Sequence, residues 1–90
     1  MTPAAAAILE DVARTRRIRR DRILSRERTI AVSRARQEIF ARLYALRRGG
    51  ASTGAVYSSA QIGRWFERDH STVLWGIRAH EARMAEGRGA

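Results

Sequence analysis

The chain has 90 residues, no cysteine and a formal net charge of +9. This length suits one small domain, and without cysteine there are no disulfides or thiol chemistry. All 18 basic residues are arginine, whose planar guanidinium suits phosphate groups and guanine edges, so the charge indicates a polyanionic partner. No stretch is long and apolar enough to cross a membrane, and we expect a cytoplasmic protein.

Two helices are expected in the N-terminal quarter. Thr2 is a typical N-cap and Pro3 suits the first helical position, so a helix is predicted over residues 4–16. A bend near residues 15–20 and a short helix over residues 21–25 follow. The side chains expected to face the core are Ile8, Leu9, Val12, Ile23 and Leu24.

Most of the net charge lies between Arg14 and Arg36, where ten arginines stand against Asp21 and Glu27, giving +8. Such a run is compatible with a solvated basic face or with a surface for acidic protein or lipid. Because a helix-turn-helix pattern follows it in the sequence, we favour a surface that tracks phosphates. Residues 26–32 have no clear periodicity and are predicted to form a basic loop.

The clearest long helix is predicted over Ser33 to Arg48, with Ser33 as its cap. Its first turns carry Arg34, Arg36 and Gln37, where side chains and free backbone N–H groups can meet phosphate. A link over residues 49–57 follows. The apolar stripe expected to face the core consists of Ala35, Ile39, Leu43 and Leu46, flanked by Phe40.

A helix-turn-helix is predicted over about residues 59–84. Ser58 with Gln61 three residues later has the form of a capping box, which starts the first helix. A second helix begins at Asp69 and continues to about Met84, and two helices joined so closely must cross at a wide angle. The core-facing residues expected are Trp65 and Phe66 of the first helix and Val73, Gly76, Ile77, His80 and Met84 of the second.

Trp75 falls nearly opposite the core-facing stripe of the second helix, beside Ser71 and Arg78. Packing within an isolated domain does not explain a tryptophan there, so we expect Trp75 to be exposed and to touch a partner. The alternative is a half-buried side chain held by a neighbouring loop or by a second copy.

Several motifs resemble the C-terminal DNA-binding domain of DnaA, the bacterial replication initiator. The run Arg68-Asp69-His70-Ser71-Thr72-Val73-Leu74 resembles its R-D-H-T-T-V-L signature, and Ile62-Gly63-Arg64 resembles the I-G-R of the preceding helix. Arg34-Ala35-Arg36-Gln37 is similar to its R-P-R-Q motif, with alanine in place of proline. The resemblance covers about residues 8–84. It implies one all-α domain over residues 1–90, a five- or six-helix bundle containing the helix-turn-helix.

The resemblance also implies a DNA site. It places Arg28 of the basic loop in the minor groove and the head of the second helix in the major groove. The expected DNA-binding residues are Arg28, Arg34, Arg36, Gln37, Arg68, Asp69, His70, Ser71, Thr72, Trp75 and Arg78.

Three residues depart from the family. Ser71 stands where the family has threonine, and Trp75 where it has histidine, so DNA affinity is expected more firmly than recognition of the same sequence. Glu67 stands alone where the family often has glycine. A left-handed helix end is costly for glutamate, so we expect a tighter turn or one that is helical throughout.

No enzyme is expected. His70 and His80 cannot share a metal on one helix at this spacing, and Ser71 beside His70 is not a nucleophile and base, because helix neighbours point apart. No cofactor is predicted. The function expected is a nucleoid-associated regulator that binds double-stranded DNA and modulates replication initiation. The alternatives are an adaptor that binds replication-initiation proteins and an accessory or phage transcriptional regulator.

Overall fold

The computed structural model describes residues 1–46 and 56–89, and every regular element in these ranges is a helix, which confirms the expected all-α class. No strand occurs in the described ranges. The expected ends of the long helix at residues 47–48, and most of the link that follows, lie outside them. In chain order the helices are α1 (Pro3–Arg16), α2 (Arg20–Leu24), α3 (Ile30–Ala45), α4 (Ser59–Phe66) and α5 (His70–Gly89).

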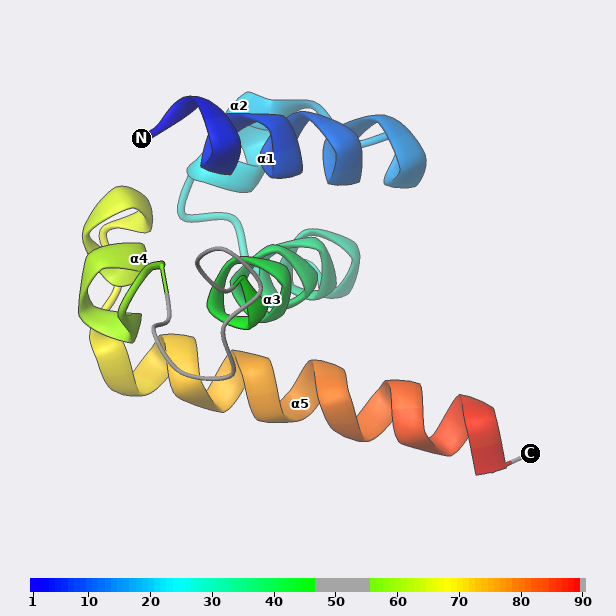
Figure 1. Ribbon diagram of the computed structural model, residues 1–90. Coiled ribbons are helices and arrows are strands. Elements are labelled where there is room, and N and C mark those ends of the chain that lie inside the picture. The colour runs from blue at the N-terminus through cyan, green and yellow to red at the C-terminus, as the bar shows by residue number, and fades with distance from the viewer. Residues whose placement is uncertain (47–55, 90) are drawn as a thin grey trace.

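Helix α3 is the centre of the bundle and contacts each of the other four helices. In Figure 1, α1 and α2 lie on one side of α3, α5 crosses its opposite side, and α4 lies beside them. This position requires apolar residues around much of its circumference. Those buried on α3 are Val32, Ala35, Ile39, Phe40 and Leu43, which confirms most of the predicted stripe.

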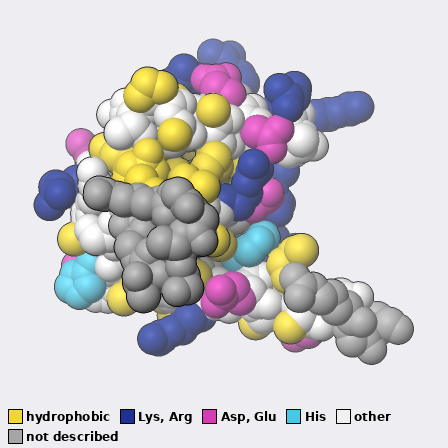
Figure 2. Space-filling model, in the orientation of Figure 1, with side chains coloured by type: hydrophobic (Ala, Val, Ile, Leu, Met, Phe, Trp, Pro, Cys, Tyr) yellow, Lys and Arg dark blue, Asp and Glu magenta, His cyan; other side chains and the backbone are white. Residues whose placement is uncertain are grey.

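The surrounding helices each contribute a few buried side chains to the same core. They are Leu9 and Val12 from α1, Ile23 from α2, Ile62 and Phe66 from α4, and Val73 and Ile77 from α5. The rings of Phe40 and Phe66 meet edge to face, with centroids 5.1 Å apart, and join α3 to α4. In the view of Figure 2, apolar side chains gather beneath α1, while arginines lie mainly around the rim of the molecule.

Both ends of α1 are fixed as the sequence suggests. The Thr2 hydroxyl accepts from the Ala5 backbone N–H at 3.2 Å and also bonds the Tyr57 hydroxyl, which ties the N-terminus to the start of α4. At the other end Arg17 adopts a left-handed conformation, with φ 56°. The Ile18 N–H then bonds the Ala13 carbonyl and its side chain enters the core, so the predicted bend is a helix-ending motif.

Several predicted boundaries and core positions are wrong. Helix α3 begins at Ile30, because Ser33 already donates its N–H to the Thr29 carbonyl at 2.9 Å, so Ser33 lies inside the helix. The loop before α3 is therefore shorter than predicted. Ile30 is 70% exposed, which is why apolar periodicity missed this start.

Met84 was expected in the core but is 48% exposed. It lies at the open edge beside Ala45, the last residue of α3, while α5 continues to Gly89. Leu24 is likewise exposed, because α2 is only one short turn and only Ile23 reaches the core. Ile8, Leu46 and Trp65 are partly buried against the core, and His80 is also half-buried.

The turn between α4 and α5 keeps the left-handed residue that the sequence argued against. Glu67 has φ 53° and ψ 45°. The Arg68 N–H bonds the Gly63 carbonyl at 2.8 Å and the Glu67 N–H bonds the Arg64 carbonyl at 3.4 Å, the two bonds of a Schellman motif. The expected tighter or fully helical turn is therefore wrong, because these bonds satisfy the last carbonyls of α4 and offset the strain at Glu67.

Two glycines set the distances between these helices. A Cβ on Gly63 would lie 2.4 Å from the Arg68 carbonyl oxygen, so only glycine lets the turn fold back over α4. A Cβ on Gly76 would lie 3.1 Å from Phe40 and 3.2 Å from Gln37, so Gly76 lets α5 approach α3 closely. Both glycines thus permit close approaches that a Cβ would hinder.

Gly63→Ala should destabilise the domain, and Gly87→Ala is its matched control. Alanine in a helix gains about 1 kcal/mol over glycine by propensity alone. At Gly87 nothing lies within 4 Å of the added Cβ, so the control should be neutral or stabilising. At Gly63 the collision with backbone should outweigh that gain and lower the unfolding midpoint in urea. Equal stabilisation by both changes would contradict the observed turn.

Candidate nucleic-acid interface

A hollow of about 430 Å³ opens where the loop before α3, the first turns of α3 and the first turns of α5 meet. It brings together residues from parts of the chain that are far apart in sequence. Its lining consists of Arg28, Ser33, Arg36, Gln37, Phe40, Arg68, Thr72, Trp75 and Gly76. Six of these were singled out from the sequence as candidate DNA contacts, and the fold gathers them at one place.

Helix α5 contributes Thr72, Trp75 and Gly76 to this lining. Residues three and four apart lie on one side of a helix. Trp75 and Gly76 follow Thr72 at these spacings, so all three face the hollow. Trp75 is 65% exposed, as its helix phase predicted. A large aromatic ring therefore stands in solvent at the edge of a basic hollow.

Arg36 does not have the role expected from its motif. Its side chain is buried, and its guanidinium donates to the carbonyls of Ile23 at 2.7 Å, Glu27 at 2.6 Å, Ser25 at 2.6 Å and Arg22 at 3.3 Å. The carbonyls at the end of a helix lack hydrogen-bond donors within that helix. Arg36 provides such donors for carbonyls of α2 and of the loop. The prediction that this guanidinium meets phosphate is wrong, because its donors are engaged inside the protein.

Arg68 links the same loop to the helix-turn-helix. Its guanidinium donates to the Phe66 carbonyl at 3.0 Å, within the turn, and to the Ser25 carbonyl at 3.2 Å. The Ser25 carbonyl thus accepts from both Arg36 and Arg68. Burial first, and then the charge of Arg68, lower the pKa of Arg36, so these two cations lie close together and share neutral acceptors.

The loop is held from a second side by Glu27. Its carboxylate accepts from Arg22 at 2.6 Å and from the Thr29 hydroxyl at 2.7 Å, and these bonds lower its pKa to about 2. With Glu27 engaged in this way, the neighbouring side chains of Arg26 and Arg28 remain exposed. Arg28 lines the hollow, so the loop presents it at the place expected of a DNA contact.

The basic segment carries less free charge than the expected +8, in which Asp21 and Glu27 are already counted. Half of its arginines are paired with carboxylates: Arg14 with Asp11, Arg16 with Glu38, Arg19 with Asp21, Arg20 with Glu10 and Arg22 with Glu27. These pairs lie on α1, on α2 and the residues that flank it, and on the part of α3 that faces α1.

Other arginines have no carboxylate among the described residues within ion-pair distance. Near the hollow and along α5 these are Arg26, Arg28, Arg34, Arg68, Arg78 and Arg83. Arg17 after α1 and Arg64 of α4 also lack such a pair, so the uncompensated charge includes the loop, the start of α3 and α5 but is not confined to them.

The residues at the N-terminal end of α5 are exposed but lie outside the hollow. Ser71 donates its hydroxyl to the Asp69 carboxylate at 2.9 Å, and this bond is the main reason that the pKa of Asp69 is lowered. His70 lies 3.2 Å from the same carboxylate. A small polar group at the N-terminal end of α5 thus consists of Asp69, His70 and Ser71. Arg34 on α3 and Arg78 on α5 are also exposed, and neither lines the hollow.

Some residues of the site were not identified from the sequence. Ser33, Phe40 and Gly76 line the hollow, and Arg83 donates to the Gln37 side-chain oxygen at 2.7 Å. A signal for Arg83 did exist: it lies seven residues after Gly76, two helical turns on the same side of α5. The partner of the Arg36 guanidinium could not be read in this way, because main-chain carbonyls leave no sequence pattern.

No protein-family model, curated protein or solved structure matches the chain. The DnaA resemblance consequently rests on the motifs quoted above. Among the described residues, no group of three or more histidine or acidic side chains could hold a metal ion, and no helix is long and apolar enough to cross a membrane.

Arg36→Lys should destabilise the domain although it keeps the charge, because one ammonium cannot replace a guanidinium that bonds four carbonyls. Hydrogen bonds to charged groups contribute about 1.5–3 kcal/mol each, so a loss of at least this size is expected in urea unfolding. Arg28→Lys, at an exposed position without an ion pair, is the matched control and should stay within about 0.5 kcal/mol. Equal stability of the two variants would show that the Arg36 bonds are dispensable.

Proposed function

We propose that the chain is a DNA-binding regulator related to the replication initiator DnaA, which binds duplex DNA through its helix-turn-helix and basic loop and modulates replication initiation. One observation supports this above the others. Arg28, Gln37, Arg68, Thr72 and Trp75, chosen from the sequence on the DnaA resemblance, line one hollow. The fold brings these residues from three separate segments to one place, where a single ligand can contact them together.

The charge distribution supports a phosphate-rich partner. Arg28 and Arg68 line the hollow and have no carboxylate of the described residues within ion-pair distance, whereas Arg14, Arg16 and Arg20 of the N-terminal part are paired. Free guanidinium groups displace counterions from DNA, whereas paired groups do so less readily. The side of the molecule that carries the helix-turn-helix is therefore the side best suited to a duplex.

The individual roles follow from position. Arg28 projects from a fixed loop and suits a narrow, negative minor groove. Thr72 and Trp75 offer a hydroxyl, methyl and aromatic surface to base edges in the major groove, while Asp69 can accept from a cytosine amino group. Arg34 and Arg78 are exposed and suit phosphates. Arg36 and Arg68 position the loop and the turn rather than serving as free contacts.

Within these 90 residues there is no phosphate-binding loop of a nucleotide hydrolase. A regulator of this kind acts by occupying DNA sites or by recruiting another protein.

A second candidate function is an adaptor for replication-initiation proteins. The observation that favours it is Trp75, which is 65% exposed where the family has histidine. Exposed aromatic side chains are frequent anchors of protein interfaces. This candidate predicts a protein partner at the same hollow.

The proposal is tested by titrating duplexes that contain or lack the DNA box of the DnaA family, each at several salt concentrations. The affinity should fall steeply with salt, with a slope of about 0.9 for every phosphate neutralised. Arg28→Ala should weaken binding most on sites with an A/T-rich flank, while Arg14→Ala, whose charge is already paired with Asp11, serves as the control. Binding that does not change between low and moderate salt would exclude the phosphate surface.

Trp75→His separates the two candidate functions. Because the side chain is exposed, the change should leave stability within about 0.5 kcal/mol. If the hollow binds DNA, base preference should move toward the family's box; if it binds protein, DNA affinity should stay constant and a replication-protein complex should weaken. Trp65→His is the contrast, since Trp65 packs edge to face on Tyr57 and its loss should destabilise the fold. Unfolding caused by Trp75→His would contradict both functions for this residue.

A further inference from the structure

Arg83 is a half-buried cation in the middle of α5, beyond the part of the helix that the DnaA resemblance assigns to DNA. Its guanidinium donates to the Gln37 side-chain oxygen at 2.7 Å, which fixes it against α3. A neutral amide oxygen occupies one of its donors, and no carboxylate of the described ranges lies within ion-pair distance. Its charge is held in place but is not neutralised.

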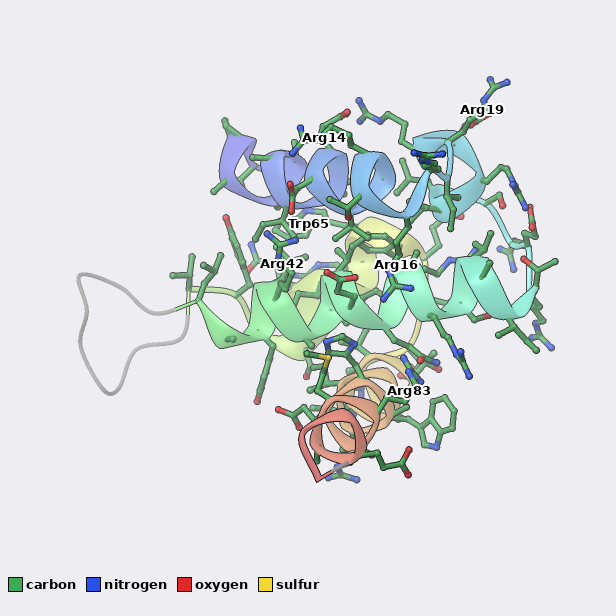
Figure 3. The ribbon with its side chains drawn as sticks, turned by 90° about the vertical axis from the view of Figure 1, so that its right-hand side faces the viewer. Arg14, Arg16, Arg19, Arg42, Trp65 and Arg83 are labelled. Atoms are coloured by element: carbon green, nitrogen blue, oxygen red, sulfur yellow. The ribbon has the colours of Figure 1, made fainter. Side chains whose placement is uncertain are left out.

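Other positive charges lie nearby. After burial, the charges of Arg34 and then Arg16 lower the pKa of Arg83, and only Glu86 opposes them. Arg16 is itself paired with Glu38 at 2.7 Å, so Arg34 is the free neighbour. In Figure 3, Arg16 from α1 and Arg83 from α5 flank α3 on the side that faces the viewer. Mutual repulsion of fixed guanidinium groups is relieved by a bound anion.

Arg34 and Arg83 lie beside a residue of the hollow. Gln37 lines the hollow and is also the acceptor for Arg83, and Arg34 lies one turn before it on α3. Through Gln37, Arg83 therefore lies next to the hollow, and Arg34 lies one turn away on α3.

We propose that Arg34 and Arg83 form a phosphate-binding site that extends the DNA contact beyond the first turns of α5. This site rests on the proposed DNA-binding function and takes backbone phosphates of the same duplex. The hydrogen bond to Gln37 holds the Arg83 guanidinium against α3. Arg83 thereby adds affinity without sequence preference, because phosphate contacts carry no base information.

The test uses the full chain and a duplex centred on the DnaA-family box, with affinity measured over a range of salt concentrations. Arg83→Gln should lower the salt slope by about 0.9 and weaken binding to every sequence to a similar extent. Arg83→Lys keeps the point charge and should retain most of the slope. Arg14→Gln removes a charge that Asp11 already neutralises, and it controls for net charge alone.

The outcomes are distinguishable. If wild-type binding is flat with salt, the proposed DNA function fails, and this site fails with it. If the wild type shows a steep slope but Arg83→Gln and Arg14→Gln change it equally, DNA binding stands and the Arg34–Arg83 site is overturned. Loss of affinity in both Arg83→Gln and Arg83→Lys, with an unchanged slope, would make Arg83 a packing residue only and would also overturn it. Circular dichroism and thermal melting verify that each variant is folded.

Discussion

The arrangement of this domain depends on one buried cation. Arg36 leaves the central helix α3 and bonds four carbonyls at the end of α2 and in the loop after it. A buried guanidinium is tolerated only when its donors are satisfied, and here main-chain carbonyls satisfy them. These bonds hold the loop, which contains no regular structure, against α3. Arg36, which its motif suggested as a phosphate contact, instead positions the loop that carries Arg28.

The same support extends to the helix-turn-helix through the Ser25 carbonyl, which accepts from both Arg36 and Arg68. Arg68 lies in the turn that the left-handed Glu67 and the missing Cβ of Gly63 make possible. The basic loop and the head of α5 are thus fixed to one another through a main-chain oxygen. This coupling explains why Arg28 and Trp75, far apart in sequence, border the same hollow.

Much of this could be predicted from residue patterns, because helix phase, caps and glycine act locally. Thr2 as a cap and the exposure of Trp75 follow from such rules. The pairing of arginines with acids on other helices could not be predicted, because it depends on which helices meet. The burial of Arg36 could not be predicted for the same reason. The start of α3 was not predicted because Ile30 is an exposed apolar residue, which gives no periodic signal.

The most direct measurement of the interface is a residue-by-residue map of the protein when duplex DNA is added, by amide and indole chemical shifts in solution. We expect the largest shifts at Arg28, Gln37, Thr72 and the Trp75 indole N–H, with smaller ones at Arg34 and Arg83. The outer face of α1, where Arg14 is paired with Asp11, should stay unchanged. Shifts confined to α1, or absent from the hollow at saturating DNA, would contradict a DNA interface at this place.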